Sequence, residues 1–159
     1  MENKGTYIAV KYNQYSILKL LEISNKFEVP NLLNLEDIHT TLIYSTKGAD
    51  NVEVYHSINY VGIPKKLEIW KSSDGTPCLV LTLNSDAMVN RHKELMDTYG
   101  FTYDYDEYKP HITLSYDVTG WDKLEELNNH IVSNRIYFML VTTNEYVEDL
   151  NIGWKDYKK

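Results

Sequence analysis

The sequence predicts an α+β protein whose sheet is mainly antiparallel. Short stretches that alternate between apolar and polar side chains recur along the chain, as in strands with one buried face. Other stretches space apolar residues three and four positions apart, as amphipathic helices do. An internal repeat is also visible, because residues 6–45 and 78–117 share the order strand, helix, connection, strand. We therefore expect a bilobal fold, with two pseudo-symmetric β-α-β lobes around a central groove, in a single domain over residues 1–159.

The first half of the chain opens with a predicted strand over residues 6–11, which are mostly apolar and β-prone. Asn13 is a suitable N-cap for a helix over residues 14–27, because its side chain can accept hydrogen bonds from free backbone N–H groups. A loop then leads to a strand over residues 38–44. Residues 46–60 contain a turn signal followed by scattered apolar side chains, and they fit either a helix or a strand.

The second half begins with a predicted antiparallel hairpin, in which strands over residues 65–72 and 78–84 flank a turn that contains Gly75. A helix over residues 86–99 follows, and Gly100 is well placed to end it because glycine readily adopts the left-handed conformation. The remaining elements are, in order, a strand over residues 111–116, a helix from Thr119 or Gly120 to about Ser133, and a β-rich segment over residues 136–143 that extends towards Val147.

The composition is that of a globular protein, with 43% hydrophobic and 25% charged residues in a chain of 159. The net charge of −7 argues against long nucleic acid as a partner, because that affinity comes largely from cationic contacts to many phosphates. A small nucleotide in a locally positive cleft is compatible with this charge. Most of the 14 tyrosines are expected to pack, although a tyrosine ring can also stack on a base.

The sequence lacks the residue patterns of a disulfide, a zinc site, a membrane span and a signal peptide. Cys78 is the single cysteine, so it cannot form an internal disulfide, and we interpret it as a buried structural thiol. No Cys/His cluster has zinc-ligand spacing, and we expect neither a metal nor another cofactor. No apolar stretch approaches the length of a membrane span, and the N-terminal residues do not resemble a signal peptide. We therefore expect a cytoplasmic protein without a membrane partner, whose oligomeric state the sequence leaves open.

Two histidines lie in the same short phrase of the sequence. Residues 39–44 and 111–116 both read His-x-Thr-Leu-x-Tyr, and His111 follows His39 by 72 positions. Because side chains alternate along a strand, His and Thr of each phrase should share one face, with Leu and Tyr on the other. One such phrase alone would usually be structural. Two copies at the end of the same strand–helix pattern favour a shared function.

Two imidazoles and two hydroxyls suit acid–base chemistry on a phosphodiester without a metal ion. Imidazole titrates near neutrality, so one of His39 and His111 can accept a proton while the other donates one to the leaving oxygen. Thr41 and Thr113 can donate hydrogen bonds to the non-bridging oxygens. Asp37 precedes His39 on the same strand face, where its carboxylate could orient the imidazole. The sequence does not decide which histidine is the base.

These phrases on a duplicated α+β framework resemble the 2H phosphoesterase superfamily over nearly the whole chain. Residues 5–11 and 36–45 resemble more narrowly the bacteriophage anti-CBASS phosphodiesterases, which cut cyclic oligonucleotide messengers of bacterial antiphage systems. The resemblance implies metal-independent cleavage of 3′–5′ bonds in a cyclic di- or trinucleotide, and evasion of CBASS immunity. It implies catalytic roles for His39, Thr41, His111 and Thr113.

Further aromatic and acidic residues are candidates for contacts with the substrate. Tyr7 begins the first strand and could reach the mouth of the groove, while Trp70 ends a strand beside a turn and could cap a base. Glu148 could accept an amino group of a purine, and Trp154 could stack on its ring. Ordinary packing is an equally good interpretation of these aromatic residues.

Two other functions remain open at this point. An RNA 2′,3′-cyclic phosphodiesterase or a 2′,5′-oligoadenylate phosphodiesterase of the same superfamily would use the same two phrases. A protein that only sequesters the cyclic nucleotide would need no acid–base pair, so the intact phrases argue against it. The sequence also leaves open the preferred base, the ring size and whether water or a 2′-hydroxyl attacks.

Overall fold

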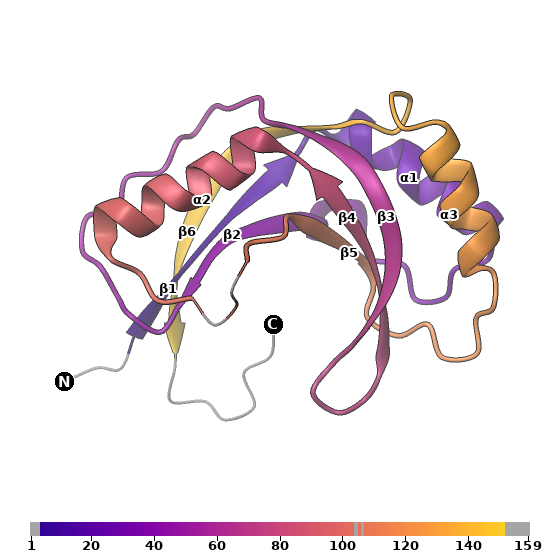
Figure 1. The fold of residues 1–159 in the computed structure, drawn as a ribbon, viewed down its shortest axis with the longest axis horizontal. Coiled ribbons are helices and arrows are strands. Elements are labelled where there is room, and N and C mark those ends of the chain that lie inside the picture. Colours follow the sequence, from indigo (N-terminus) through magenta and orange to yellow (C-terminus); the bar gives the residue numbers. More distant parts are fainter. Residues whose placement is uncertain (1–3, 104, 106, 152–159) are drawn as a thin grey trace.

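The computed structural model describes residues 4–103, 105 and 107–151. Within them the chain forms a six-stranded sheet and three α-helices, which confirms the predicted α+β class (Figure 1). The strands are β1 (Lys4–Tyr12), β2 (His39–Ser45), β3 (Val61–Lys71), β4 (Pro77–Asn84), β5 (His111–Ser115) and β6 (Leu140–Asn151). The helices are α1 (Gln14–Lys26), α2 (Asp86–Tyr99) and α3 (Leu124–Ser133), and a short 3-10 helix covers Leu35–Asp37. In this part of the chain, none of the helices has the length and apolar character needed to cross a membrane.

Local signals for the first two helices are confirmed, but three other boundaries are wrong. The strand predicted from residue 65 begins at Val61. Asn13 caps α1 with its side chain, and Gly100 ends α2 in a left-handed conformation with φ of 66°. The third helix begins only at Leu124, because Gly120 before it takes a left-handed conformation (φ 82°) that interrupts regular structure. The last strand begins at Leu140, since the residues before it form a turn closed by their own backbone hydrogen bonds.

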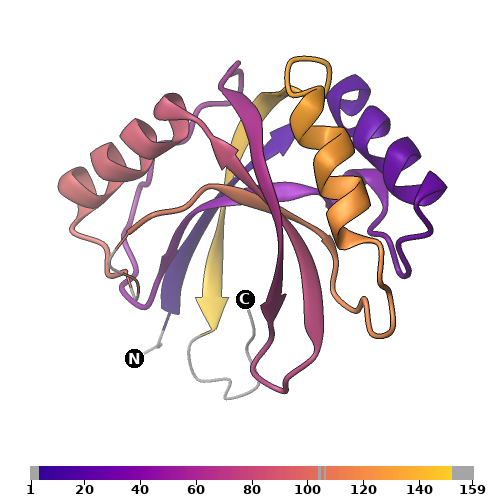
Figure 2. The same cartoon turned by 45° about the vertical axis from the view of Figure 1, so that its right-hand side comes forward.

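The sheet consists of two halves that are joined by a short pairing. Every strand pair is antiparallel, and the strand order is β2-β1-β6-β3-β4-β5. Between the halves, β3 and β6 share only the pairs Val61 with Val141 and Gly62 with Leu140. The sheet is strongly bent, and the helices lie on its outer side (Figures 1 and 2). The two edge strands, β2 and β5, therefore come close to each other.

Helices α1 and α2 each lie on the side of the half of the sheet to which they do not belong by sequence (Figure 2). α1 follows β1 but lies beside α3, on the side of β3, β4 and β5 (Figure 2). There Trp121 Nε1 donates to the carbonyl of Phe27 at 2.9 Å, and the Phe27 ring lies 5.9 Å from that of His130 in α3. α2 follows β4 but packs against β2, where His92 contacts the carbonyl of Leu42. The two halves of the sheet are thus covered by exchanged helices.

Residues 46–60 form neither a helix nor a strand and are held by a buried ion pair. Arg91 Nε and Nη2 donate to the two carboxylate oxygens of Glu145 at 2.8 and 3.0 Å. Glu145 also accepts a hydrogen bond from the backbone N–H of Tyr55 and one from the hydroxyl of Tyr60. One carboxylate on β6 therefore fixes both α2 and the irregular segment.

Replacing Glu145 by alanine should lower the free energy of unfolding by about 3–5 kcal/mol, because buried Arg91 would keep only the exposed carboxylate of Glu94. Urea denaturation measures this change. Glu94→Ala is the matched control, since Glu94 pairs with the same guanidinium but its side chain is 57% exposed; its loss should cost less than about 1 kcal/mol. Equal effects of the two substitutions would contradict this account of the ion pair.

Candidate active site

Both His-x-Thr phrases form edge strands, and these edges meet. His39 and Thr41 lie in β2, while His111 and Thr113 lie in β5. Between them, Thr40 Oγ1 donates a hydrogen bond to the backbone carbonyl of His111 at 2.8 Å. The two phrases are therefore in direct contact although 72 residues separate them in sequence.

Both phrases contain a β-bulge at the same position. In the pairing of β2 with β1, Thr41 and Ile43 face successive residues of β1, so Leu42 is an extra residue. In the pairing of β5 with β4, Leu114 is the extra residue in the same way. Both leucines are fully buried. A bulge shifts the alternation of side chains by one position, so the residues after it change faces.

The bulges place the tyrosine of each phrase on the face that carries the threonine. Tyr44 pairs with Tyr7 across the strands, and the Tyr7 hydroxyl lies 3.0 Å from Thr41 Oγ1. Burial raises the pKa of Tyr116, while a hydrogen bond from Thr113 lowers it in part. The expectation that tyrosine and leucine share a face is therefore wrong, because strict alternation does not hold across a bulge.

The backbone orients both imidazoles in the same way. His39 Nδ1 lies 2.9 Å from the carbonyl oxygen of Asp37, and His111 Nδ1 lies 2.8 Å from that of Lys109. A carbonyl oxygen only accepts, so Nδ1 carries the proton in each ring, and Nε2 of the neutral ring is an acceptor. The main-chain oxygen of Asp37, rather than the expected carboxylate, is thus the group that orients His39.

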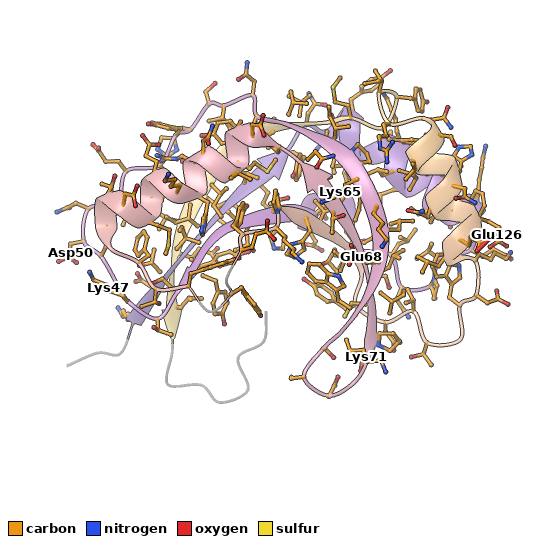
Figure 3. All side chains as sticks on the ribbon, in the orientation of Figure 1. Lys47, Asp50, Lys65, Glu68, Lys71 and Glu126 are labelled. Atoms are coloured by element: carbon orange, nitrogen blue, oxygen red, sulfur yellow. The ribbon has the colours of Figure 1, made fainter. Side chains whose placement is uncertain are left out.

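His111 packs against Trp70, with ring centroids 4.5 Å apart. Burial lowers the pKa of His111; the hydrogen bond to Lys109 opposes this shift, whereas the nearby charge of His39 adds to it. Glu68 on β3 (Figure 3) raises the pKa of His111 as well. It accepts a hydrogen bond at 2.8 Å from Nε1 of Trp70, two residues further along the same strand. His111 therefore keeps its neutral form to lower pH than an ordinary histidine.

The predicted substrate contacts that the structure describes lie around these histidines. The Tyr7 ring packs edge-on against His39 with centroids 6.3 Å apart, and the Trp70 ring packs against His111 at a tilt of 58°. Glu148 is exposed and directly opposite Tyr7 on β6, so the two share a face of the sheet. Trp154 lies outside the described residues.

The sequence does not single out two further residues on this face. Tyr146 packs against Tyr7 with ring centroids 6.2 Å apart, and Lys11 Nζ lies 5.3 Å over the Tyr146 ring. Lys11 is also directly opposite His39 and donates to the carbonyl of Glu36 at 2.8 Å. Tyr146 lies two residues before Glu148 and so shares its face of the strand. Its proximity to Tyr7 depends on the strand order, which places β6 beside β1.

The side chains gathered here suit proton transfer and hydrogen bonding to an anion. Each imidazole has a fixed Nδ1–H, and each phrase adds a threonine hydroxyl to its histidine. Aromatic rings flank the two histidines on both sides. Across the described residues, His, Cys, Asp and Glu side chains do not form a group of three or more that could hold a metal ion.

Comparison with known proteins identifies relatives over nearly the whole chain. The sequence model of a family described as "Anti-CBASS protein Acb1" matches residues 4–157. The protein of that name from Enterobacteria phage T4 is 34% identical, over 96% of this chain and 92% of its own length. The Yersinia phage phiR1-RT protein is 32% identical over 96% and 93%, and that of Vibrio phage KVP40 is 29% identical over 97% and 93%. The chain therefore belongs to the anti-CBASS protein Acb1 family.

Proposed function

We propose that this protein is a metal-independent phosphodiesterase that cleaves 3′–5′ bonds of cyclic di- or trinucleotides and so counters CBASS immunity in the host cytoplasm. One observation carries the proposal: two His-x-Thr phrases meet at adjoining sheet edges, each with its imidazole oriented by the carbonyl two residues before it. The names of its relatives support the anti-CBASS role.

The repeat favours a single 2H phosphoesterase-like domain over residues 1–159. Support comes from features that recur at equivalent places in both phrases. These are the bulge at the leucine and the hydrogen bond from Nδ1 to a carbonyl. Such equivalence is expected when two copies of one unit face a shared groove.

In the proposed mechanism His111 is the base and His39 the acid. The lowered pKa of His111 keeps this ring neutral, so its Nε2 accepts the proton of the attacking water or 2′-hydroxyl. The phosphorus–oxygen bond to the leaving group then breaks, and protonated His39 donates to that oxygen. Thr41 and Thr113 donate hydrogen bonds to the non-bridging oxygens, where negative charge accumulates.

The surrounding residues suit a small anionic nucleotide. Trp70 on one side and the tyrosines around Tyr7 on the other would stack on bases, and Glu148 would accept a hydrogen bond from an exocyclic amino group. Lys11 is directly opposite His39 on the neighbouring strand. Lys66 pairs with Thr82, which in turn pairs with His111, so Lys66 lies two strands away from His111 at the same level of the sheet. These two lysines supply positive charge in a protein with a net charge of −7.

A panel of nucleotides followed by mass spectrometry tests the proposal. The purified protein is incubated in EDTA with cyclic dinucleotides, cyclic trinucleotides, 2′,5′-oligoadenylate and an RNA that ends in a 2′,3′-cyclic phosphate. Linear products from the cyclic nucleotides are expected. Cleavage of only the other two substrates would assign the protein to RNA or oligoadenylate processing. Recovery of intact but tightly bound cyclic nucleotide would make it a sequestering protein.

The pH dependence of kcat/KM should be bell-shaped, with an acid limb below the ordinary histidine pKa of about 6.5, because the limb reports the base of the free enzyme. Trp70→Leu should expose His111 and shift that limb to higher pH, since burial is the main cause of its lowered pKa. Trp70→Phe keeps a ring over His111 and serves as the control. An acid limb that stays in place in Trp70→Leu would remove the reason to assign His111 as the base.

A further inference from the structure

Side chains hold two successive backbone carbonyls at the β2 bulge. The Tyr108 hydroxyl donates to the carbonyl of Thr41 at 2.7 Å, and His92 Nδ1 lies 2.7 Å from the carbonyl of Leu42. The His92 and Tyr108 rings stack with an angle of 6° and a centroid distance of 4.2 Å. A bulge locally disrupts the ladder between strands, so these two donors fix the backbone where the ladder does not.

The chemical state of both donors is set by their burial. Burial lowers the pKa of His92, and the bond to Leu42 opposes this shift only in part, so the ring is neutral near pH 7 with its proton on Nδ1. Burial raises the pKa of Tyr108 well above its ordinary value, so its hydroxyl remains protonated and donates. The edge of Tyr103 closes over His92, with ring centroids 4.8 Å apart.

Tyr108 also connects the two His-x-Thr phrases. Tyr108 is followed by Lys109, whose carbonyl orients His111, so anchoring Tyr108 to Thr41 also anchors the segment that carries this carbonyl. The hydrogen bond from Thr40 to the backbone of His111 adds a second link. A displacement of Tyr108 would therefore move both Thr41 of the first phrase and His111 of the second.

The second phrase is held in a reciprocal way. Its bulge residue Leu114 accepts a hydrogen bond from the backbone N–H of Leu33 at 2.9 Å, and Ser115 Oγ donates to the carbonyl of Pro30 at 2.7 Å. Residues 30–33 lie in the connection that leads into β2. Each bulge therefore contacts the connection that precedes the other phrase. The bulge carbonyls of the first phrase accept hydrogen bonds from side chains, whereas the Leu114 carbonyl of the second accepts one from a backbone N–H.

We propose that His92 and Tyr108 are positioning residues that act as a unit on the catalytic centre. They hold the bulge carbonyls and thereby set the place of the Thr41 hydroxyl and, through Lys109, of the His111 imidazole. The inference rests on the proposed function of the two phrases. Neither residue would touch the substrate, so their loss should reduce kcat and leave KM nearly unchanged.

Four variants test this role. Tyr108→Phe removes one hydroxyl and keeps the stacked ring, while His92→Leu removes the other donor; each should lower kcat by about 10–100-fold, as small misplacements of reacting groups do. His92→Asn retains an N–H donor near the position of Nδ1 and should recover most of the lost kcat. Tyr99→Phe is the matched control, because the Tyr99 hydroxyl also bonds a backbone group, the N–H of Glu53, away from both phrases.

Titration of the histidine rings by NMR, in protein without nucleotide, separates this proposal from the proposed function. Tyr108→Phe and His92→Leu should change the titration of His111, and Tyr99→Phe should leave it unaltered at a similar loss of thermal stability. If His92→Leu and Tyr108→Phe alter only stability, as the control does, the positioning role is overturned. If the wild-type protein cleaves no nucleotide, the proposed function fails, and the titration of His111 alone decides the positioning role.

Discussion

Replacing His111 by alanine should lower kcat for cyclic dinucleotide cleavage by about 10²–10⁴-fold, because the attacking group loses the general base of the proposed mechanism. His39→Ala should have a comparable effect through loss of the acid. His56→Ala is the control, since His56 is exposed in the irregular segment and should not affect turnover. Thermal unfolding of each variant checks that the fold is intact. Near-normal turnover in either active-site variant would remove that histidine from the mechanism.

A substrate whose leaving group needs no proton distinguishes the acid from the base. A nucleotide p-nitrophenyl phosphodiester releases a phenolate that needs no proton, so His39→Ala should lose much less activity on it than on the natural bond. His111→Ala should remain as impaired as before, because the attacking group still needs a base. The opposite result would exchange the roles of acid and base between the two histidines.

Removing the hydroxyls of Thr41 and Thr113 is the second substitution with a large expected effect. Thr41→Val and Thr113→Val keep the size of the side chain, and each should lower kcat by about 10²–10³-fold, because one donor to the charged phosphate oxygens is lost. Thr41→Ser and Thr113→Ser retain the hydroxyl and should keep most of the activity. Valine variants as active as the serine variants would contradict a direct role for these hydroxyls.

The α+β class and the placement of both phrases on strands follow from local patterns. Strand alternation, the Asn13 cap and the Gly100 stop act over a few residues, so the sequence reveals them directly. The contact between the two phrases was inferable from the repeat, since two equivalent units that face each other place their equivalent strands together. The hydrogen bond from Thr40 to His111 agrees with that inference.

The bulges and the neighbours of each phrase could not be predicted in this way. An extra residue at Leu42 or Leu114 leaves the local hydrophobic pattern almost unaltered, yet it changes the face on which Tyr44 lies. Tyr146 joins the site only because β6 inserts between β1 and β3. Such long-range pairing depends on the whole fold and leaves no local signal in the sequence.

The exchange of α1 and α2 between the halves of the sheet has a consequence for the origin of the repeat. A solitary repeat unit of this kind could not shield its own strands, because its helix reaches over the strands of the other unit. Such a unit would bury its apolar surface only by trading helices with an identical copy. The present chain therefore has, within one polypeptide, the arrangement of helices expected of a domain-swapped homodimer of two such units.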